Sequence, residues 1–142
     1  MKFKSITMEN FMRYKGVNTI EFSCDPGKNV TVVCGDNTCG KTTSAQAFRF
    51  GLYGAGNMEK WKNADDYQLL NNDVLAFMDA DRKAAVSVTI VAADEEKQYT
   101  ICRKTIYSRN YPQMTCREFQ KKVSMKIGDL QAPDVVTEVD ER

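Results

Sequence analysis

The chain has 142 residues, 42% of them hydrophobic, which suits a single domain with one modest core. A formal net charge of +1 argues neither for nor against a nucleic-acid partner. Five cysteines without a CxxC pair and the absence of histidine exclude a Cys/His zinc site. No stretch has the apolar length of a signal peptide or a membrane span, so we expect an intracellular, cytoplasmic protein with reduced thiols and no membrane partner.

Strand patterns occupy the first part of the chain. Residues 3–8 have the composition of a strand, and residues 17–22 alternate between apolar and polar side chains. A strong turn signal, Asp-Pro-Gly-Lys, follows at 25–28. Residues 29–34 are short, β-branched and nearly apolar on both faces, which predicts a buried central strand.

A helical pattern comes next. It begins at Thr42 and ends near Gly51 and Gly54. The side chains expected on its apolar face are Ala45, Phe48 and Leu52. Two further short helices are expected around residues 64–70 and 74–78.

The second half of the chain is rich in strand patterns. Residues 85–92 alternate, residues 99–107 are β-rich, and the polar segment 94–97 between them predicts an antiparallel hairpin. Residues 123–127 alternate again and predict a third strand. The polar tail from Pro133 is expected to fray.

One motif carries chemistry. Residues 35–42, GDNTCGKT, match G-x-x-x-x-G-K-[ST] at every fixed position, with an apolar strand pattern before and a helix pattern after them. Glycines allow the backbone to curl so that successive N–H groups surround an anion, and the helix adds its positive end. The predicted nucleotide-binding residues are Gly35, Asp36, Asn37, Thr38, Cys39, Gly40, Lys41, Thr42 and Thr43.

The chemistry of such a loop assigns separate roles to its residues. Lys41 is expected to reach the β- and γ-phosphates and is the one catalytic residue predicted, while the Thr42 hydroxyl is expected to bind Mg²⁺. Thr43 lies toward the α-phosphate. Thr38 is β-branched and would be strained if the loop needs a positive φ there. The Cys39 thiol is either small filler or a modification-sensitive group.

A basic stretch lies further along the chain. Between Tyr99 and Lys126 there are seven basic residues and one acid, Glu118. Such a run is either a solvated face or a contact for nucleic acid. Its basic residues are Arg103, Lys104, Arg109, Arg117, Lys121, Lys122 and Lys126.

The order of these segments resembles that of a known family. Residues 1–11, MKFKSITMENF, are similar to the ΦxΦxNF entry of SMC-like ATPases, and so are YKG at 14–16 leading to IEF at 20–22, and LYG at 52–54 after the helix. The combination of RYKG at 13–16 with LYG most resembles the DndD family, ATPases associated with DNA phosphorothioate modification.

The resemblance implies a fold and an assembly. Residues 1–142 would form the N-terminal lobe of an ABC-type head, an α/β P-loop NTPase fold with a mixed sheet and an antiparallel β subdomain. In this family a C-terminal lobe, after a coiled coil, supplies the signature motif, the Walker B acid and the catalytic Glu. Two heads then enclose two ATP molecules and clamp DNA.

The sequence departs from this family pattern in several respects. It has no Walker B run, no signature motif and no heptads, and Thr38 replaces the usual Gly. The Q-loop glutamine cannot be placed, and Gln113 and Gln131 are guesses for it. We therefore expect a fragment that binds ATP with Mg²⁺ without turnover and exposes apolar surface. Arg13 lies one position after the family's basic residue, so it is either solvated or in contact with adenine or ribose.

Two other classes of function remain open. A small P-loop kinase or GTPase would carry the same loop, although two strand patterns precede it here and no Asn-Lys-x-Asp guanine motif is present. A non-catalytic interaction domain that has lost nucleotide binding is the other class, and Thr38 is the residue in its favour.

Overall fold

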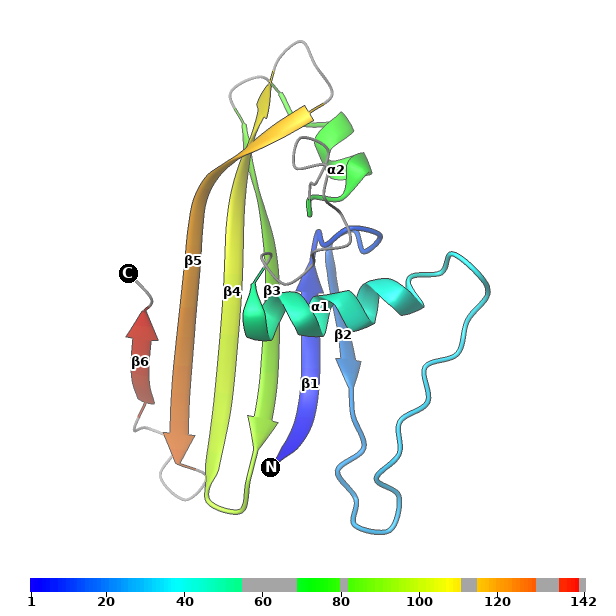
Figure 1. The fold of residues 1–142 in the computed structure, drawn as a ribbon, viewed down its shortest axis with the longest axis vertical. Coiled ribbons are helices and arrows are strands. Elements are labelled where there is room, and N and C mark those ends of the chain that lie inside the picture. The colour runs from blue at the N-terminus through cyan, green and yellow to red at the C-terminus, as the bar shows by residue number, and fades with distance from the viewer. Residues whose placement is uncertain (55–68, 80–81, 111–114, 130–135, 141–142) are drawn as a thin grey trace.

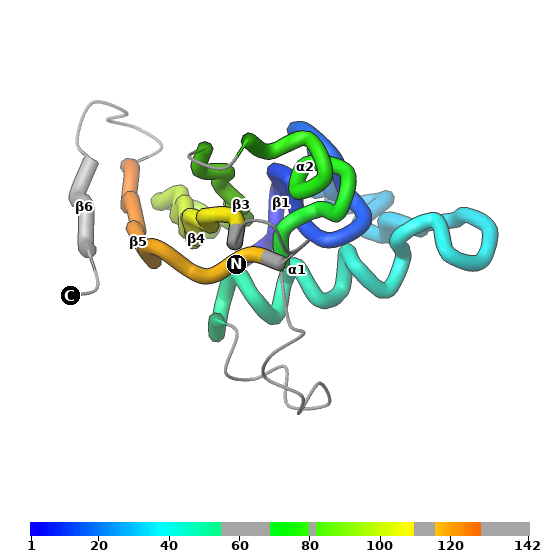
Figure 2. Tube along the Cα trace, turned by 90° about the horizontal axis from the view of Figure 1, so that it is seen from above, coloured from blue at the N-terminus to red at the C-terminus, as the bar shows by residue number. Residues whose placement is uncertain are grey.

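The computed structural model describes residues 1–54, 69–79, 82–110, 115–129 and 136–140. They form one six-stranded sheet in the order β2-β1-β3-β4-β5-β6, with helix α1 running across one face (Figure 1). Seen from above, α1 follows one side of the strands (Figure 2). The elements are β1 Lys2–Glu9, β2 Val17–Glu21, α1 Lys41–Tyr53, α2 Asn72–Ala76, β3 Lys83–Ala93, β4 Lys97–Asn110, β5 Thr115–Asp129 and β6 Val136–Asp140.

The strands predicted at 3–8, 17–22, 85–92, 99–107 and 123–127 are confirmed, and most of them are longer than their sequence patterns. The predicted hairpin is confirmed too, because β4 pairs antiparallel with β3 along the whole of β3. In the hairpin turn, the backbone N–H groups of Lys97 and Glu96 donate to the Asp94 carboxylate and lower its pKa.

The sheet has one apolar and one polar face. On the polar face the Thr7 and Thr19 hydroxyls are 2.9 Å apart, and Ser87 donates to Glu9 across 2.9 Å. The opposite face is covered by α1 and carries the core. The sheet side chains buried in the core are Ile6, Met8, Val86, Val88 and Ile90.

Helix α1 packs directly on this apolar face. A Cβ added to Gly51 would lie 2.6 Å from Ile90 Cδ1, so a side chain at that position would force the Ile90 side chain to shift. Phe50 is 2% exposed and its ring lies 5.5 Å from that of Phe11. The helix therefore has a fixed position, and the loop that precedes it starts from a fixed point.

The predicted apolar face of this helix is only partly correct. Phe48 and Leu52 are partly buried and pack against the core, whereas Ala45 is exposed. The prediction missed the fully buried part of the face, because small residues form much of it. The buried residues are Thr43, Ser44, Ala47, Phe50 and Gly51.

The predicted central strand at 29–34 is also wrong. These residues form no strand, and Val30 and Val32 are 75% and 72% exposed. In the described part of the chain, no backbone hydrogen bond joins this segment to a strand. A strand needs neighbours to satisfy its N–H and C=O groups, and the described residues supply none here.

The expected mixed sheet is wrong for the described residues, because every strand pairing among them is antiparallel. The tail expected to fray contains β6, which pairs with β5. Of the two short helices, the second is confirmed as α2, and most of the first, at 64–70, lies outside the described residues. None of the helices described is long and apolar enough to cross a membrane.

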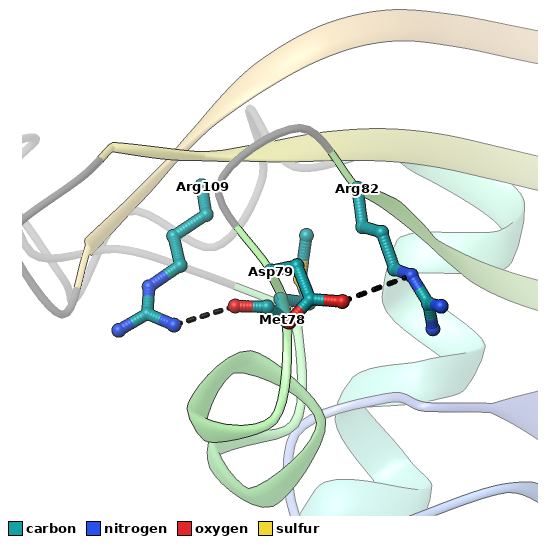
Figure 3. A network of polar contacts seen from close by, with 4 residues as sticks. All are labelled: Met78, Asp79, Arg82 and Arg109. Atoms are coloured by element: carbon teal, nitrogen blue, oxygen red, sulfur yellow. Dashed lines mark hydrogen bonds and ion pairs between the residues drawn. The ribbon is translucent and has the colours of Figure 1, made fainter.

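Helix α2 is fastened at both ends. The Asn71 side chain accepts hydrogen bonds from the backbone N–H groups of Asp73 and Val74 and so caps its N-terminus. Beyond its C-terminus, Arg109 of β4 donates to the Met78 carbonyl (Figure 3). An exposed Arg82–Asp79 ion pair lies on the other side of this carbonyl. The segment from Leu69 to Asp79 is therefore held against the end of the sheet.

Candidate phosphate-binding site

The loop at 35–40 turns directly into α1. Gly40 is the N-cap of the helix and has φ +94°, a left-handed conformation that glycine adopts without strain. Thr38 has φ +76°. The sequence predicted strain at Thr38 if its φ is positive, and it is. A left-handed backbone at a β-branched residue lowers stability by on the order of 1–3 kcal/mol.

A cavity of about 250 Å³ opens at this loop. It is polar, and its lining includes two cationic side chains, three threonine hydroxyls and no carboxylate. This donor set suits a phosphate chain. The lining residues are Arg13, Asn37, Thr38, Gly40, Lys41, Thr42 and Thr43.

Lys41 lies across the loop. Its ammonium group donates to the Gly35 carbonyl and, at 2.6 Å, to the Asp36 carbonyl. An ammonium group carries three donors, so a phosphate oxygen can share it with the two carbonyls. The lysine is thus held at the mouth of the loop, where the motif predicts contact with the outer phosphates.

The first turn of α1 suits an anion. It has no acidic residue, and no side chain caps the helix at Gly40. Its backbone N–H groups and the positive end of the helix dipole therefore face the cavity without an internal counter-charge. Thr42 is exposed and its hydroxyl is accessible, as a Mg²⁺ ligand must be, whereas Thr43 is 5% exposed.

Sequence reasoning missed Tyr14 as a site residue. Its hydroxyl lies 2.7 Å from Ser44 Oγ and 3.2 Å from the Gly40 carbonyl oxygen. The sequence places Tyr14 in a turn 26 positions before Gly40, and no periodicity links the two. Its occurrence in the segment that resembles SMC-like ATPases was the only available signal.

The structure brings Arg13 to the same cavity as the phosphate loop. Arg13 lies in a tight loop in which Asn10 and Met12 both have φ +50°. Between them, Phe11 is fully buried and forms a bridge to Leu70. This anchored loop leaves Arg13 exposed at its tip, and its contact with a nucleotide stays a prediction.

A second cavity, of about 450 Å³, shares Arg13 with the first. It combines apolar walls with amides and one carboxylate. Its lining residues are Met12, Arg13, Leu70, Asn71, Asn72 and Asp73. A larger cavity, of about 660 Å³, lies at the β3–β4 turn, but its lining contains no residue of the phosphate loop, so its size alone does not make it the site.

The cysteines differ in environment. Cys39 and Cys34 are exposed at the phosphate loop, and none of the five cysteines forms a disulfide in the described part of the chain. Cys116 is half-buried, and burial raises the pKa of its thiol to about 11, which lowers its thiolate fraction at neutral pH. The Q-loop candidates Gln113 and Gln131 lie outside the described residues.

The basic stretch is divided between the two faces of the sheet. Lys104 pairs directly with Lys122 across β4 and β5, and Lys126 follows on the same face. Lys121 points to the opposite face and forms an ion pair with Glu118 at 2.6 Å. The stretch is therefore not one continuous patch, although three of its lysines share the polar face.

Comparison with known families agrees with this geometry. Residues 5–138 match the AAA domain family, which is related to SMC-like and ABC-type ATPases. The chain belongs to this family. It therefore has an ATPase-type nucleotide-binding domain, and such ATPases generally use ATP and Mg²⁺. None of the curated proteins gives a significant match.

Proposed function

We propose that this chain is the ATP-binding N-terminal lobe of an SMC-like, ABC-type ATPase head. The observation that carries the proposal is the single cavity shared by Arg13, the phosphate loop and the first turn of α1. Lys41 would bind the outer phosphates, and Arg13 would neutralise further charge beside them. The backbone N–H groups after Gly40 would hold the remaining phosphate oxygens.

The Mg²⁺ ion and the nucleoside of a bound nucleotide also have suitable protein groups nearby. Mg²⁺ would bind at the accessible Thr42 hydroxyl and would supply charge neutralisation at the phosphates. The second cavity adjoins the first at Arg13, so a nucleoside could extend into it from the phosphates. Its Met12 and Leu70 side chains offer apolar contact and its amides offer hydrogen bonds.

We propose further that this lobe is incomplete for hydrolysis. Residues 29–34 have the composition of a buried strand, yet their valines are exposed. A C-terminal lobe of the same head would supply the missing strand partners, together with the Walker B and signature motifs, and a second head would complete the site in a dimer. Phosphoryl transfer needs groups from all these parts, so the chain alone would bind ATP without turnover.

DNA is the partner that the charge distribution favours. Lys104, Lys122 and Lys126 share the polar face of the sheet, where like charges lie opposite each other across β4 and β5. The phosphates of a DNA backbone would bind to these lysines. We place the protein in the cytoplasm, in DNA repair, recombination or the phosphorothioate-associated modification suggested by the likeness to DndD.

Calorimetric titration of Mg·ATP and Mg·GTP tests nucleotide binding. We expect ATP to bind, Lys41→Ala to lose binding at least tenfold, about 1.4 kcal/mol, and the exposed-lysine control Lys28→Ala to retain it. A preference for GTP would favour a small P-loop kinase or GTPase. Absence of binding and of any rise in melting temperature with ATP or ADP would favour a non-catalytic interaction domain.

A matched pair of charge reversals tests the DNA proposal. Lys122→Glu should weaken binding to a DNA duplex and reduce its salt dependence, since this side chain lies on the polar face. Lys121→Glu reverses a charge on the other face and serves as the control. Equal losses in the two variants, measured by fluorescence anisotropy at several salt concentrations, would remove the polar face from the DNA interface.

A further inference from the structure

We infer that Tyr14 is a positioning residue for the phosphate loop, acting through Gly40 and Ser44. It lies outside the Gly35–Thr42 motif and outside the cavity lining. The inference rests on the proposed nucleotide binding, because its consequence is the affinity of the loop for a phosphate chain. Three observations carry it: a hydroxyl network, a close ring contact and the anchoring of the loop that holds Tyr14.

The hydroxyl network joins Tyr14 to the start of α1. Tyr14 Oη lies 2.7 Å from Ser44 Oγ, and both hydroxyl groups lie 3.2 Å from the Gly40 carbonyl. One hydroxyl donates to the other, and the second donates to the carbonyl, so both protons are used in either arrangement. Ser44 is 8% exposed, so loss of this network would leave a largely buried hydroxyl with fewer partners.

The Tyr14 ring also limits the position of Gly40. A Cβ built on Gly40 would lie 3.2 Å from both Cζ and Oη of the tyrosine. The backbone at Gly40 is buried and left-handed, and it is the point where the loop becomes helix. Because Lys41 and Thr42 follow at once, the orientation of Gly40 sets the direction of their N–H groups and of the Lys41 side chain.

The loop that carries Tyr14 is itself fixed to the sheet. Asn10 donates from Nδ2 to the Ala85 carbonyl at 3.1 Å and accepts from the Gly16 N–H at 2.9 Å. The Tyr14 N–H donates to the Phe11 carbonyl at 2.8 Å, and Phe11 is fully buried. A continuous set of contacts therefore leads from β3 through Asn10 and Tyr14 to Gly40.

This arrangement gives the phosphate loop support that its own residues lack. Residues 35–39 are all exposed, so they gain little from packing. The network at Gly40 replaces that packing with directed hydrogen bonds from a rigid part of the fold. Preorganised donors bind an anion without a cost for ordering the loop, and so Tyr14 should raise affinity without touching the ligand.

Tyr14→Phe is the test variant, since it removes the hydroxyl and keeps the ring. Tyr53→Phe is the matched control: it makes the same change on α1, at a side chain that is 66% exposed. Titrations would use Mg·ATP and inorganic tripolyphosphate, which lacks a nucleoside. We expect Tyr14→Phe to raise the Kd of both ligands about fivefold, as for one lost hydrogen bond, and Tyr53→Phe to leave both unchanged.

A merely structural role would lower the unfolding midpoint of Tyr14→Phe and leave the Kd of the folded protein unchanged, and that result would overturn the inference. A second measurement needs no ligand: amide hydrogen exchange at Ser44, whose N–H donates to the Gly40 carbonyl at 2.9 Å. Faster exchange in Tyr14→Phe than in Tyr53→Phe is expected, and equal exchange would contradict the positioning role. If the wild-type chain binds neither ligand, the proposed function fails, while the exchange comparison still decides the role of Tyr14.

Discussion

The sheet core and the phosphate-loop arm, residues 23–39, are built in opposite ways. In the core, Ile6, Val86 and Val88 are completely buried between the sheet and α1. In the arm, nearly every residue is exposed, and the cyan part of the ribbon extends away from the sheet (Figure 1). The part of the chain with the most specific sequence motif therefore has the least packing around it.

The difference shows how a weakly packed loop keeps a defined geometry. The arm is fixed at its two ends, where Phe22 packs against Phe48 and where Gly40 meets Tyr14. Stability and binding should therefore depend on different residues. Changes in the core should act on the free energy of unfolding, and changes at the end of the arm should act on loop geometry.

The largest expected effect comes from the core. Phe50→Ala should lower the free energy of unfolding by about 3 to 5 kcal/mol, because it leaves a cavity under α1. Tyr53→Ala, on the exposed side of the same helix, should cost less than about 1 kcal/mol. In the arm, Val32→Ala should change the free energy by no more than about 0.5 kcal/mol. Urea denaturation measures all three, and a large loss in Val32→Ala would show that the arm is packed in solution.

An intermediate effect is expected where the arm meets the helix. Gly40→Ala should cost about 2 kcal/mol of unfolding free energy, since alanine is strained at φ +94° and its Cβ would press on the Tyr14 ring. Gly16→Ala is the matched control, because Gly16 has φ +68° and no atom within 4 Å of an added Cβ. Gly16→Ala should lower the free energy of unfolding by about 1 kcal/mol, which is the conformational strain alone. If thermal or urea unfolding shows the same loss of unfolding free energy in both variants, the Tyr14 contact contributes nothing to stability.

The smallest effect is expected inside the loop. Thr38→Gly should raise the free energy of unfolding by about 0.5 to 1 kcal/mol, because relief of the left-handed strain exceeds the added flexibility of the unfolded chain. Asn37→Gly, at a neighbouring position without positive φ, should lower it by about 0.5 kcal/mol. A destabilised Thr38→Gly variant would indicate that the threonine side chain stabilises the loop through contacts that outweigh its strain.

The sequence predicted local features well and distant ones poorly. Alternation located the strands at 17–22 and 85–92 because it depends only on neighbouring residues. The same reasoning failed at 29–34, since an apolar segment becomes a buried strand only when other strands are present to pair with it. The phosphate loop was recognisable from its fixed residues, but the contact of Tyr14 with Gly40 was not, because it depends on how two distant loops meet.

The hydrogen bonds of Lys41 have a consequence for the thermodynamics of binding. The Gly35 and Asp36 carbonyls already accept two of the three hydrogen bonds that its ammonium group can donate. A phosphate oxygen that takes the third donor therefore replaces water on a cation that the protein's own backbone already solvates in part. The net enthalpy of binding at this residue should therefore be modest.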